Sequence, residues 1–327
     1  MNKMDLTVII LTYNEEIHIR RALVNVCPIA KKVLVIDSPS TDGTQKIVSE
    51  VSEFQKVSGG ADVEFIVHKY PGNQASQFNW ALDNCEIDTE WILRLDADEY
   101  LTPELIEEMQ EKLPMLEKDV NAVVLPLGRA FMGRVLKHGI VNGVQLVRII
   151  RRGKARYEER LMDEYLKVTE GRSVMFEHKF VDDNRMTLRQ WIDKHNNYST
   201  REMITLLDAE FELYPQDVNA GTEFAEETKA KRAQKAKYAK MPLFWRSIGY
   251  FCYRYFAKLG FLDGKEGFCW DFFQGLWYRM TVDAKIYEVK KACGDDKELI
   301  IKYVKEMYNI DIKGVINKIG GGNLRGS

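Results

Sequence analysis

The first hundred residues alternate between short apolar runs and stretches whose apolar positions recur at helical spacing. Four runs rich in β-branched or aromatic residues end in polar loops, at residues 6–11, 32–36, 63–67 and 91–95. Continuous apolar runs of this length are typical of strands buried on both faces of a parallel sheet. Between the first two runs, apolar residues lie on one helix face, at Ile19, Leu23 and Val26. The pattern predicts a β-α-β unit and an α/β fold.

Polar side chains gather where these predicted strands end. Thr12 follows the first run, Asp37 follows the second, and Asp96 and Asp98 follow the fourth. Alternate residues of a strand share a face, so Asp96 and Asp98 are expected to point the same way at the carboxyl edge of the sheet, where α/β proteins hold ligands. Such a pair can share a divalent cation with a diphosphate. The alternatives are a solvated Asp-x-Asp loop, and loop capping by Thr12 and Asp37.

The organisation of the chain changes near residue 185. Upstream of it, strand-like and helix-like runs alternate, whereas the downstream part is almost wholly helical in pattern. Residues 204–227 are acidic, and residues 229–258 contain nine basic residues and no acid. Such an abrupt change of sign marks a functional face or a linker. We predict a first domain at residues 1–185, a helical region at 186–319 and a Gly-rich flexible tail at 320–327.

An aromatic stripe runs through residues 244–259 at the i, i+3, i+4, i+7 spacing of one helix face, with Arg246 and Arg254 on the other side. This pattern is typical of an interfacial membrane helix, and it predicts contact with an anionic membrane surface through residues 229–259. The alternative is a helix packed into the core of its own domain. A second aromatic stretch at residues 272–280 could form a hairpin with the first and serve both purposes. No uncharged apolar run reaches the ~18 residues of a transmembrane helix.

Composition agrees with a soluble enzyme. The chain has 327 residues, 45% of them hydrophobic, and a formal net charge of −2. Nucleic-acid-binding proteins usually show a strong basic excess, so this class is not expected. Five cysteines without a Cys-x-x-Cys pair predict neither a disulfide framework nor a structural zinc site. The N-terminus lacks a signal-peptide pattern, so a reducing, cytoplasmic location is expected.

Taken together, the first hundred residues resemble the family-2 glycosyltransferases, which are inverting enzymes of the GT-A fold. The matching motifs occur in the family's order and spacing, at residues 8–15, 35–44, 79–82 and 94–99. Their joint occurrence is specific, although each motif alone is weak. Looser matches resemble later motifs of a bacterial subgroup that glycosylates lipopolysaccharide core or lipid-linked oligosaccharides, at residues 162–164, 177–178 and 194–199. The resemblance implies a mixed sheet flanked by helices, with a helical C-terminal extension that faces the acceptor or a membrane.

The resemblance also implies an activity and a set of site residues. A hexose or N-acetylhexosamine would pass from a nucleotide-sugar, by default a UDP-sugar, to a lipid-linked glycan or a lipopolysaccharide-type acceptor. Asp98 would hold Mg²⁺ or Mn²⁺, which prefer carboxylate oxygen and would neutralise the departing diphosphate. His178 would be a further ligand to metal or phosphate, with a structural histidine as the alternative. The residues implied to bind the nucleotide are Thr12, Tyr13, Glu15, Asp37, Asp42, Gln77 and Asp96.

Inversion requires a base on the acceptor hydroxyl, and a carboxylate is the expected group. The stretch at residues 157–164 offers four acids. Asp163 and Glu164 take the place of the family's late acidic motif, and the resemblance favours Glu164. The alternative is that these acids only pair with nearby arginines. The expected location is the cytoplasm, with a peripheral position on the inner face of the plasma membrane as a variant.

One position departs from the family pattern, because Phe78 stands where a basic residue often precedes the Asn of the third motif. Lys69, Arg94 or the arginines between 148 and 152 are then expected to meet the diphosphate.

Two other classes of protein stay open. A nucleotidyltransferase on the same fold predicts a Gly-rich phosphate loop, which residues 13–16 do not supply. A non-catalytic carbohydrate- or membrane-binding module is disfavoured by the intact Asp-x-Asp motif.

Overall fold

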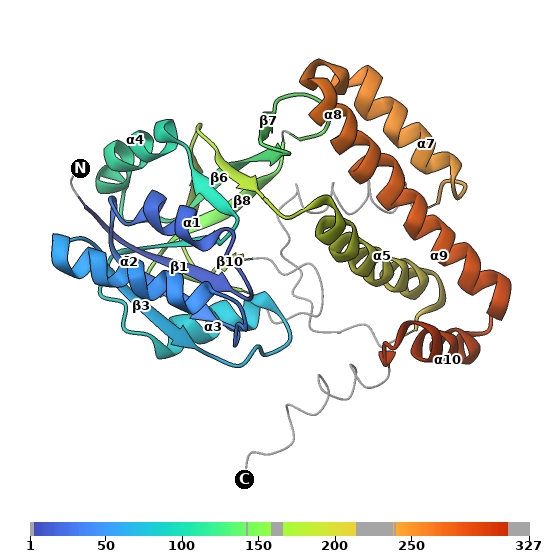
Figure 1. The fold of residues 1–327 in the computed structure, drawn as a ribbon, viewed down its shortest axis with the longest axis horizontal. Coiled ribbons are helices and arrows are strands. Elements are labelled where there is room, and N and C mark those ends of the chain that lie inside the picture. The colour runs from blue at the N-terminus through green and yellow to red at the C-terminus, as the bar shows by residue number, and fades with distance from the viewer. Residues whose placement is uncertain (1–2, 142, 158–165, 214–237, 239, 313–327) are drawn as a thin grey trace, which may run out of the picture. The chain divides into compact units, whose positions relative to one another are not determined.

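The structure is a computed structural model that describes residues 3–141, 143–157, 166–213, 238 and 240–312. The chain divides into two compact units, Met1–Arg185 (unit 1) and Met186–Ser327 (unit 2). Unit 1 combines a mixed sheet with helices, and the described part of unit 2 is helical (Figure 1). The predicted α/β class with a helical C-terminal region is confirmed. No helix in the described residues is long and apolar enough to cross a membrane.

The sheet of unit 1 is parallel at one side and mixed at the other. Strands β1, β2, β3 and β4 are mutually parallel neighbours, β8 runs antiparallel between β4 and β6, and the full order is β3-β2-β1-β4-β8-β6-β12-β5. The strands are β1 Met4–Thr12, β2 Ala30–Asp37, β3 Asp62–Val67, β4 Trp91–Asp96, β5 Glu99–Leu101, β6 Val120–Phe131, β7 Arg134–Leu136, β8 Gln145–Arg151, β11 Arg172–Met175 and β12 Phe180–Asp183. A separate hairpin joins β9 Ala155–Tyr157 to β10 Leu166–Val168.

The apolar runs form strands that are buried on both faces, as their composition predicts. In β1, Val8 and Ile10 belong to one buried cluster, whereas Ile9 belongs to another. The first cluster includes apolar residues of α1, α2 and α4, and the second includes those of α3. The helices of unit 1 are α1 Ile19–Val26, α2 Thr44–Ser58, α3 Gln74–Asn84 and α4 Pro103–Lys112, followed by the 3-10 turn η1 Leu113–Met115.

Unit 2 has a helical core of its own. Its long helix α5 begins with a capping box in which Thr187 and Gln190 exchange side-chain and backbone hydrogen bonds. Buried residues of α5, α9 and α10 form one apolar cluster, represented by Leu207, Val282 and Val304. The described elements are α5 Leu188–Phe211, α7 Trp245–Cys252, the π-helix η2 Tyr253–Ala257, the 3-10 helix η3 Gly260–Asp263, α8 Gly264–Trp270, the π-helix η4 Asp271–Trp277, α9 Tyr278–Cys293 and α10 Lys297–Tyr308.

The basic outer face predicted for the aromatic helix is wrong at its two arginines. Arg246 and Arg254 are buried, and each pairs with a carboxylate of a neighbouring helix, Asp283 or Asp271. Periodicity assigned both arginines to the solvent side, because a helix pattern does not show which acids a neighbouring helix will present. The remaining basic residues of the predicted face lie partly outside the described residues, at 229–237.

A buried carboxylate on α4 holds the turn between β11 and β12. Glu108 accepts hydrogen bonds from the Nζ of Lys112 at 2.6 Å and from the backbone N–H groups of Glu177 and His178 at 3.0 and 2.9 Å. Burial by itself raises the pKa of Glu108, but these donors stabilise the anion more strongly and lower the pKa to about 2. The ionised carboxylate therefore stabilises the folded state of unit 1.

Replacement of this carboxylate should lower stability in a pH-dependent way. Because the folded pKa lies below its ordinary value, the contribution is complete above pH 4.5 and is lost as the pH falls toward about 2. Glu108→Gln should therefore reduce the free energy of unfolding at pH 7 by up to about 3 kcal/mol. Urea unfolding at pH 7 and at pH 3.5 measures the difference, and a difference of equal size at both pH values would contradict the assignment.

Candidate active site at the carboxyl edge of the sheet

Three strands end side by side and bring together residues that are far apart in the sequence. The register pairs Thr12 of β1 with Asp37 of β2, and Leu11 of β1 with Asp96 of β4. Because β1, β2 and β4 are parallel, their carboxyl ends meet at one edge of the sheet. The structure therefore gathers Thr12, Asp37 and Asp96 at a single edge.

Asp37 is tied into the loop that follows β2. Its Oδ1 accepts the hydroxyl of Thr12 at 2.7 Å and the hydroxyl of Ser40 at 2.6 Å, while its Oδ2 accepts the backbone N–H of Ser40 at 2.8 Å. Asp37 and Thr12 are both buried. These are the contacts of a loop cap, which was the alternative reading of these two residues. They also give this edge of the sheet a fixed shape.

The loops after β1 and β2 are fastened to each other through backbone N–H groups. That of Glu15 donates to the hydroxyl of Thr44 at 2.8 Å, and that of Glu16 donates to Asp42 at 3.1 Å. Burial raises the pKa of Asp42, but hydrogen bonds from Thr44 and Glu16 outweigh it, so the pKa lies below its ordinary value. Tyr13 is 63% exposed and presents its ring to solvent above these fastened loops.

Gln77 of α3 is buried and connects the end of β3 to the same edge. Its Oε1 lies 2.7 Å from the Nδ1 of His68, and its Nε2 donates to the carbonyl of His68 at 3.3 Å and to the hydroxyl of Ser38 at 3.4 Å. The carbonyl oxygen of Gln77 can only accept, so Nδ1 of His68 carries the proton. The His68 ring stacks on Trp80 at 3.8 Å. Sequence analysis missed His68, and its position directly after the third apolar run was the available signal.

Asp96 is half-buried and belongs to a charged cluster with Arg94, Arg148 and Glu99, which are all buried. The Nη2 atoms of Arg94 and Arg148 each lie 3.4 Å from one of its carboxylate oxygens, and its backbone N–H donates to Glu99 at 2.9 Å. Arg148 also pairs with Glu99. Burial raises the pKa of Asp96, but the two guanidinium groups outweigh it and hold the pKa below its ordinary value. Burial and the neighbouring Asp96 raise the pKa of Glu99 well above its ordinary value, despite Arg148.

The basic residues expected to meet a diphosphate separate into two groups. Arg94 and Arg148 lie at Asp96, and the guanidinium of Arg94 also lies 4.7 Å from the ring centroid of Tyr157. Arg151 instead pairs with Glu90 before β4, and Arg152 donates to a backbone carbonyl nearby, so both lie at the opposite edge of the sheet. Lys69, the third candidate, is exposed in the loop after β3.

Asp98 forms hydrogen bonds with residues that sequence analysis did not single out. Its Oδ2 accepts a hydrogen bond from the side chain of Asn184 at 3.0 Å. Its carbonyl accepts the backbone N–H of Asp183 at 2.9 Å and the Nη2 of Arg21 at 2.8 Å. Arg21 also pairs with Asp183. These contacts fix the backbone of Asp98, and Asn184 orients its half-buried carboxylate.

A buried histidine extends this support to the loop after β1. The Nε2 of His18 accepts the backbone N–H of Arg185 at 2.9 Å, and its Nδ1 lies 2.6 Å from Glu15. Because Nε2 accepts, the proton of the neutral ring sits on Nδ1 and is donated to the Glu15 carboxylate. His18 therefore joins Glu15 to the segment that supports Asp98. Only its place three residues after Glu15 could have indicated this.

The structure does not bring His178 to Asp98. His178 precedes β12, where its Nδ1 lies 2.9 Å from Glu108, whereas Asn184 follows β12 and contacts Asp98. His178 and Asn184 are separated by the whole of β12, which by itself spans roughly 13 Å. Among the described residues, no three His, Cys, Asp or Glu side chains form a group that could hold a metal ion. A cation at Asp98 would therefore need ligands besides the described side chains, such as substrate or water oxygens.

The expected bases, Asp163 and Glu164, lie outside the described residues. The strands on either side of them are described, and Tyr157 of β9 pairs with Leu166 of β10. Tyr157 exchanges two backbone hydrogen bonds with the side chain of Asn79, at 2.9 and 3.0 Å. Tyr157, the last described residue before these acids, thus lies beside Arg94.

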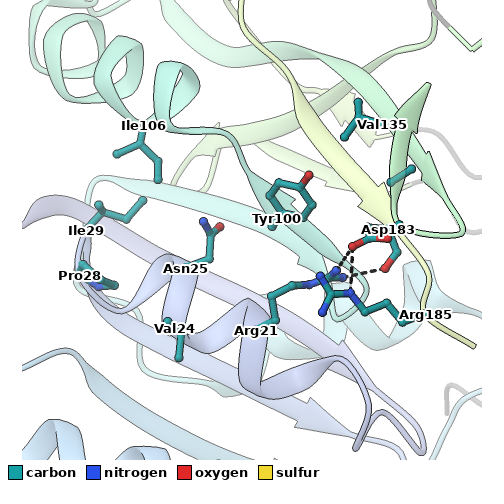
Figure 2. A pocket seen from close by; sticks show the side chains of 12 residues that line it. Arg21, Val24, Asn25, Pro28, Ile29, Tyr100, Ile106, Val135, Asp183 and Arg185 are labelled. Atoms are coloured by element: carbon teal, nitrogen blue, oxygen red, sulfur yellow. Dashed lines mark hydrogen bonds and ion pairs between the residues drawn. The ribbon is translucent and has the colours of Figure 1, made fainter. Parts of the chain in front are cut away.

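An open pocket with a volume of ≈ 580 Å³ adjoins the residues that support Asp98 (Figure 2). Figure 2 shows Arg21 and Arg185 reaching Asp183 at one end of the pocket, with Tyr100 nearby. Apolar side chains of α1 and α4 line other parts of it, including Val24 and Ile106. None of the site residues expected from the sequence lines this pocket.

Comparison with known proteins identifies the family. A family model described as "Glycosyl transferase family 2" matches residues 7–194, and the chain belongs to this family. Membership and the mixed sheet together confirm the predicted GT-A fold class. An uncharacterized glycosyltransferase of Rickettsia bellii (strain RML369-C) is 39% identical over 101 residues, which cover 31% of this chain and 30% of the relative. The chain thus matches less than a third of the length of such curated relatives.

Solved structures of low sequence identity are also similar. The mannosyltransferase PcManGT of Pyrobaculum calidifontis, in complex with GDP-Man and Mn²⁺, has a TM-score of 0.49 at 15% identity and is covered over 88% of both chains. TarS 1–349 of S. aureus has a TM-score of 0.43 at 16% identity, with 94% of this chain and 91% of that chain covered.

The charged cluster at Asp96 predicts losses of stability of different size for Arg148 and Glu99. Arg148→Met removes the ion-pair partner of the buried Glu99 and one of the two cations beside Asp96, so it should destabilise unit 1 by about 3–5 kcal/mol. Glu99→Gln should cost less, because a pKa raised in the folded state means that folding disfavours the charged form of Glu99 relative to water. Urea unfolding of both variants at pH 7 measures the order, and a larger loss in Glu99→Gln would contradict this account of the cluster.

Proposed function

We propose that this protein is an inverting glycosyltransferase that moves a hexose or N-acetylhexosamine from a nucleotide-sugar to a lipid-linked glycan or a lipopolysaccharide-type acceptor. The observation that carries the proposal is the geometry of Asp98, whose carboxylate is oriented by Asn184 at the edge where the polar loops of β1, β2 and β4 converge. Family membership supports the transferase class. Unit 1 then provides catalysis, and residues 186–319 face the acceptor or the membrane.

The residues at this edge fit a divalent cation bound together with a diphosphate. Asp98 supplies hard carboxylate oxygen, which Mg²⁺ and Mn²⁺ prefer, and such ions are commonly held by one or two carboxylates plus substrate phosphates. A bound cation would neutralise the charge that develops on the departing diphosphate. Asp96 already faces Arg94 and Arg148, so its proposed role is to orient the ribose rather than to hold the metal. We leave His178 out of the metal site because of its distance from Asp98.

The nucleotide would lie over the fastened loops after β1 and β2. The exposed ring of Tyr13 is available to contact the base or ribose, and Asp37 and Asp42 hold the loops in shape. Arg94 and Arg148 supply positive charge near the proposed diphosphate and so replace the basic residue that Phe78 displaces.

UDP is the proposed nucleotide. Nucleotide release across a panel of UDP- and GDP-sugars with Mn²⁺ tests this choice and also separates a transferase from a binding module.

The proposed base is Glu164, with Asp163 as the second candidate. The described ends of their segment support this, because Tyr157 is anchored to Asn79 beside Arg94. The base would take the proton of the acceptor hydroxyl as that oxygen attacks the anomeric carbon. Nucleotide-sugar and a lipid-linked acceptor would meet at the inner face of the plasma membrane, so a cytoplasmic, membrane-peripheral position completes the proposal.

Loss of the proposed metal ligand should abolish turnover without unfolding the protein. Asp98→Asn should lower kcat/KM by at least about 100-fold, because it removes charge from the metal ligand. The melting temperature should change little, since the variant keeps an oxygen that can accept from Asn184. Asp62→Asn is the matched control, because Asp62 is exposed at the opposite end of the parallel strands, and it should retain activity. Undiminished turnover in excess EDTA would remove the metal from the proposal.

The base prediction concerns the chemical step alone. Glu164→Gln should slow turnover by roughly 10²–10⁴-fold while nucleotide affinity stays unchanged, because the base acts on the acceptor. Asp163→Asn tests the second candidate in the same way. Glu158→Gln and Glu159→Gln are matched controls from the same acidic segment and should lose little activity. Calorimetric titration of the nucleotide and single-turnover rates measure the two quantities. A loss of only a few-fold in both Glu164→Gln and Asp163→Asn would place the base elsewhere.

A further inference from the structure

The helical hairpin of unit 2 has the reverse of the usual distribution of polar and apolar side chains. Arg246 of α7 and Asp283 of α9 are 2% and 1% exposed, and Arg254 of η2 and Asp271 of η4 are 3% and 1% exposed. Large apolar side chains of the same segment lie on its surface instead, and Trp245 is 74% exposed. Helices in water normally bury the apolar face and expose the charged one.

The pair of Arg246 and Asp283 is well hydrogen-bonded, so this part of the inverted arrangement is a built one. Asp283 accepts the Nε of Arg246 at 2.8 Å, the hydroxyl of Ser247 at 2.8 Å and the backbone N–H of Phe244 at 2.9 Å. These bonds join α7 to α9, which run alongside each other in Figure 1. The second pair joins η2 to η4, with the Nε of Arg254 2.8 Å from Asp271. In this second pair, the Nη2 of Arg254 and the Oδ2 of Asp271 are buried without a hydrogen-bond partner among the described residues.

Glycines allow the second pair to form where the helices approach. A Cβ on Gly260 would lie 1.9 Å from the Oδ2 of Asp271, and a Cβ on Gly275 would lie 3.2 Å from the side chain of Arg254. A methyl group at Gly260 would thus occupy the space of the carboxylate. Small residues at helix contacts and charges paired toward the interior are both typical of helices that pack in contact with lipid.

The outer surface of the hairpin is aromatic and aliphatic. Eight large apolar side chains are exposed between α7 and α8, namely Trp245, Ile248, Tyr253, Phe256, Leu259, Phe261, Leu262 and Phe268. The pocket found in unit 2 is lined by residues 272–288 and involves none of them. An apolar surface of this extent on a soluble protein usually marks contact with a membrane or with another protein.

The charges on this surface favour a membrane as the occupant. The segment at residues 245–270 is described throughout, and its exposed charged residues are Lys258 and Lys265. Its two acids differ, because Asp263 is buried and Glu266 is half-buried. Basic residues at the rim of an aromatic and aliphatic surface complement anionic lipid headgroups.

We propose that the hairpin formed by α7, η2, η3 and α8 enters the headgroup region of an anionic membrane with its eight exposed apolar side chains. Trp245 and Tyr253 would lie at the level of the headgroups, and Phe261 and Leu262 of η3 would lie at the apolar end of the hairpin. Lys258 and Lys265 contact lipid phosphates. This replaces the membrane contact expected from the sequence, in which Arg246 and Arg254 faced the lipid. The inference does not depend on the reaction proposed above.

Vesicle flotation of the full chain tests the apolar contact. The wild type should float with vesicles that contain anionic phosphatidylglycerol. The double variant Phe261→Ser/Leu262→Ser should bind at least about tenfold more weakly, because each side chain loses its transfer into an apolar phase. Its melting temperature should be unchanged, since both side chains are exposed. The matched control is Phe54→Ser/Val57→Ser, which removes exposed apolar side chains of α2 and should bind as the wild type does.

A second pair of variants tests the role of charge. Lys258→Glu/Lys265→Glu should weaken binding to anionic vesicles and leave any binding to neutral phosphatidylcholine vesicles unchanged. Asp98→Asn should float like the wild type, so a failure of the transferase proposal would not be mistaken for a failure of this one. Absence of flotation, or equal flotation of the Phe261→Ser/Leu262→Ser variant, would overturn the proposal. So would light scattering that shows a dimer which this variant abolishes, because a second copy would then cover the surface.

Discussion

The pairing of buried charges at the end of β4 is the constraint on which the rest of unit 1 depends. Charged groups removed from water are stable only when opposite charges and hydrogen bonds compensate them. Arg94 and Arg148 provide this compensation for Asp96 and Glu99, and in doing so they join β4, β8 and the start of β5. The position of Asp98, two residues beyond Asp96, follows from this cluster.

A second set of contacts fixes Asp98 and joins it to the loop after β1. Arg21 and Asp183 hold the backbone carbonyl of Asp98, and Asn184 orients its carboxylate. His18 then joins the same segment to Glu15 in the loop after β1. A rigid arrangement of this kind is what a site needs when one carboxylate must keep its place as a diphosphate and a cation bind and leave.

Unit 2 also contains buried ion pairs, but there they accompany an exposed apolar surface. Its buried pairs, Arg246 with Asp283 and Arg254 with Asp271, hold the helices together through charge, while aromatic side chains lie outside. Buried ion pairs contribute little net stability compared with apolar packing, but they specify which helices meet. The inverted hairpin therefore gives up apolar packing that water would favour, which is why we assign its outer surface to lipid.

The sequence by itself determined the elements and their order. Apolar runs such as residues 6–11 predict strands buried on both faces, and Val8, Ile9 and Ile10 are indeed divided between two buried clusters. It also determined that Thr12, Asp37 and Asp96 collect at one edge, because parallel strands bring their carboxyl ends together. Both results follow from local periodicity, which depends only on neighbours along the chain.

Only the tertiary structure decided which partners those residues meet. Arg151 and Arg148 are three residues apart in β8, yet one lies at Glu90 and the other at Asp96. His178 resembled a ligand in the sequence but meets Glu108, and Arg246 resembled a surface charge but meets Asp283. The energy of a charged side chain is set by groups that are distant in the sequence. Periodicity therefore predicts the face of the helix or strand on which a residue lies, but not which charged group it will pair with there.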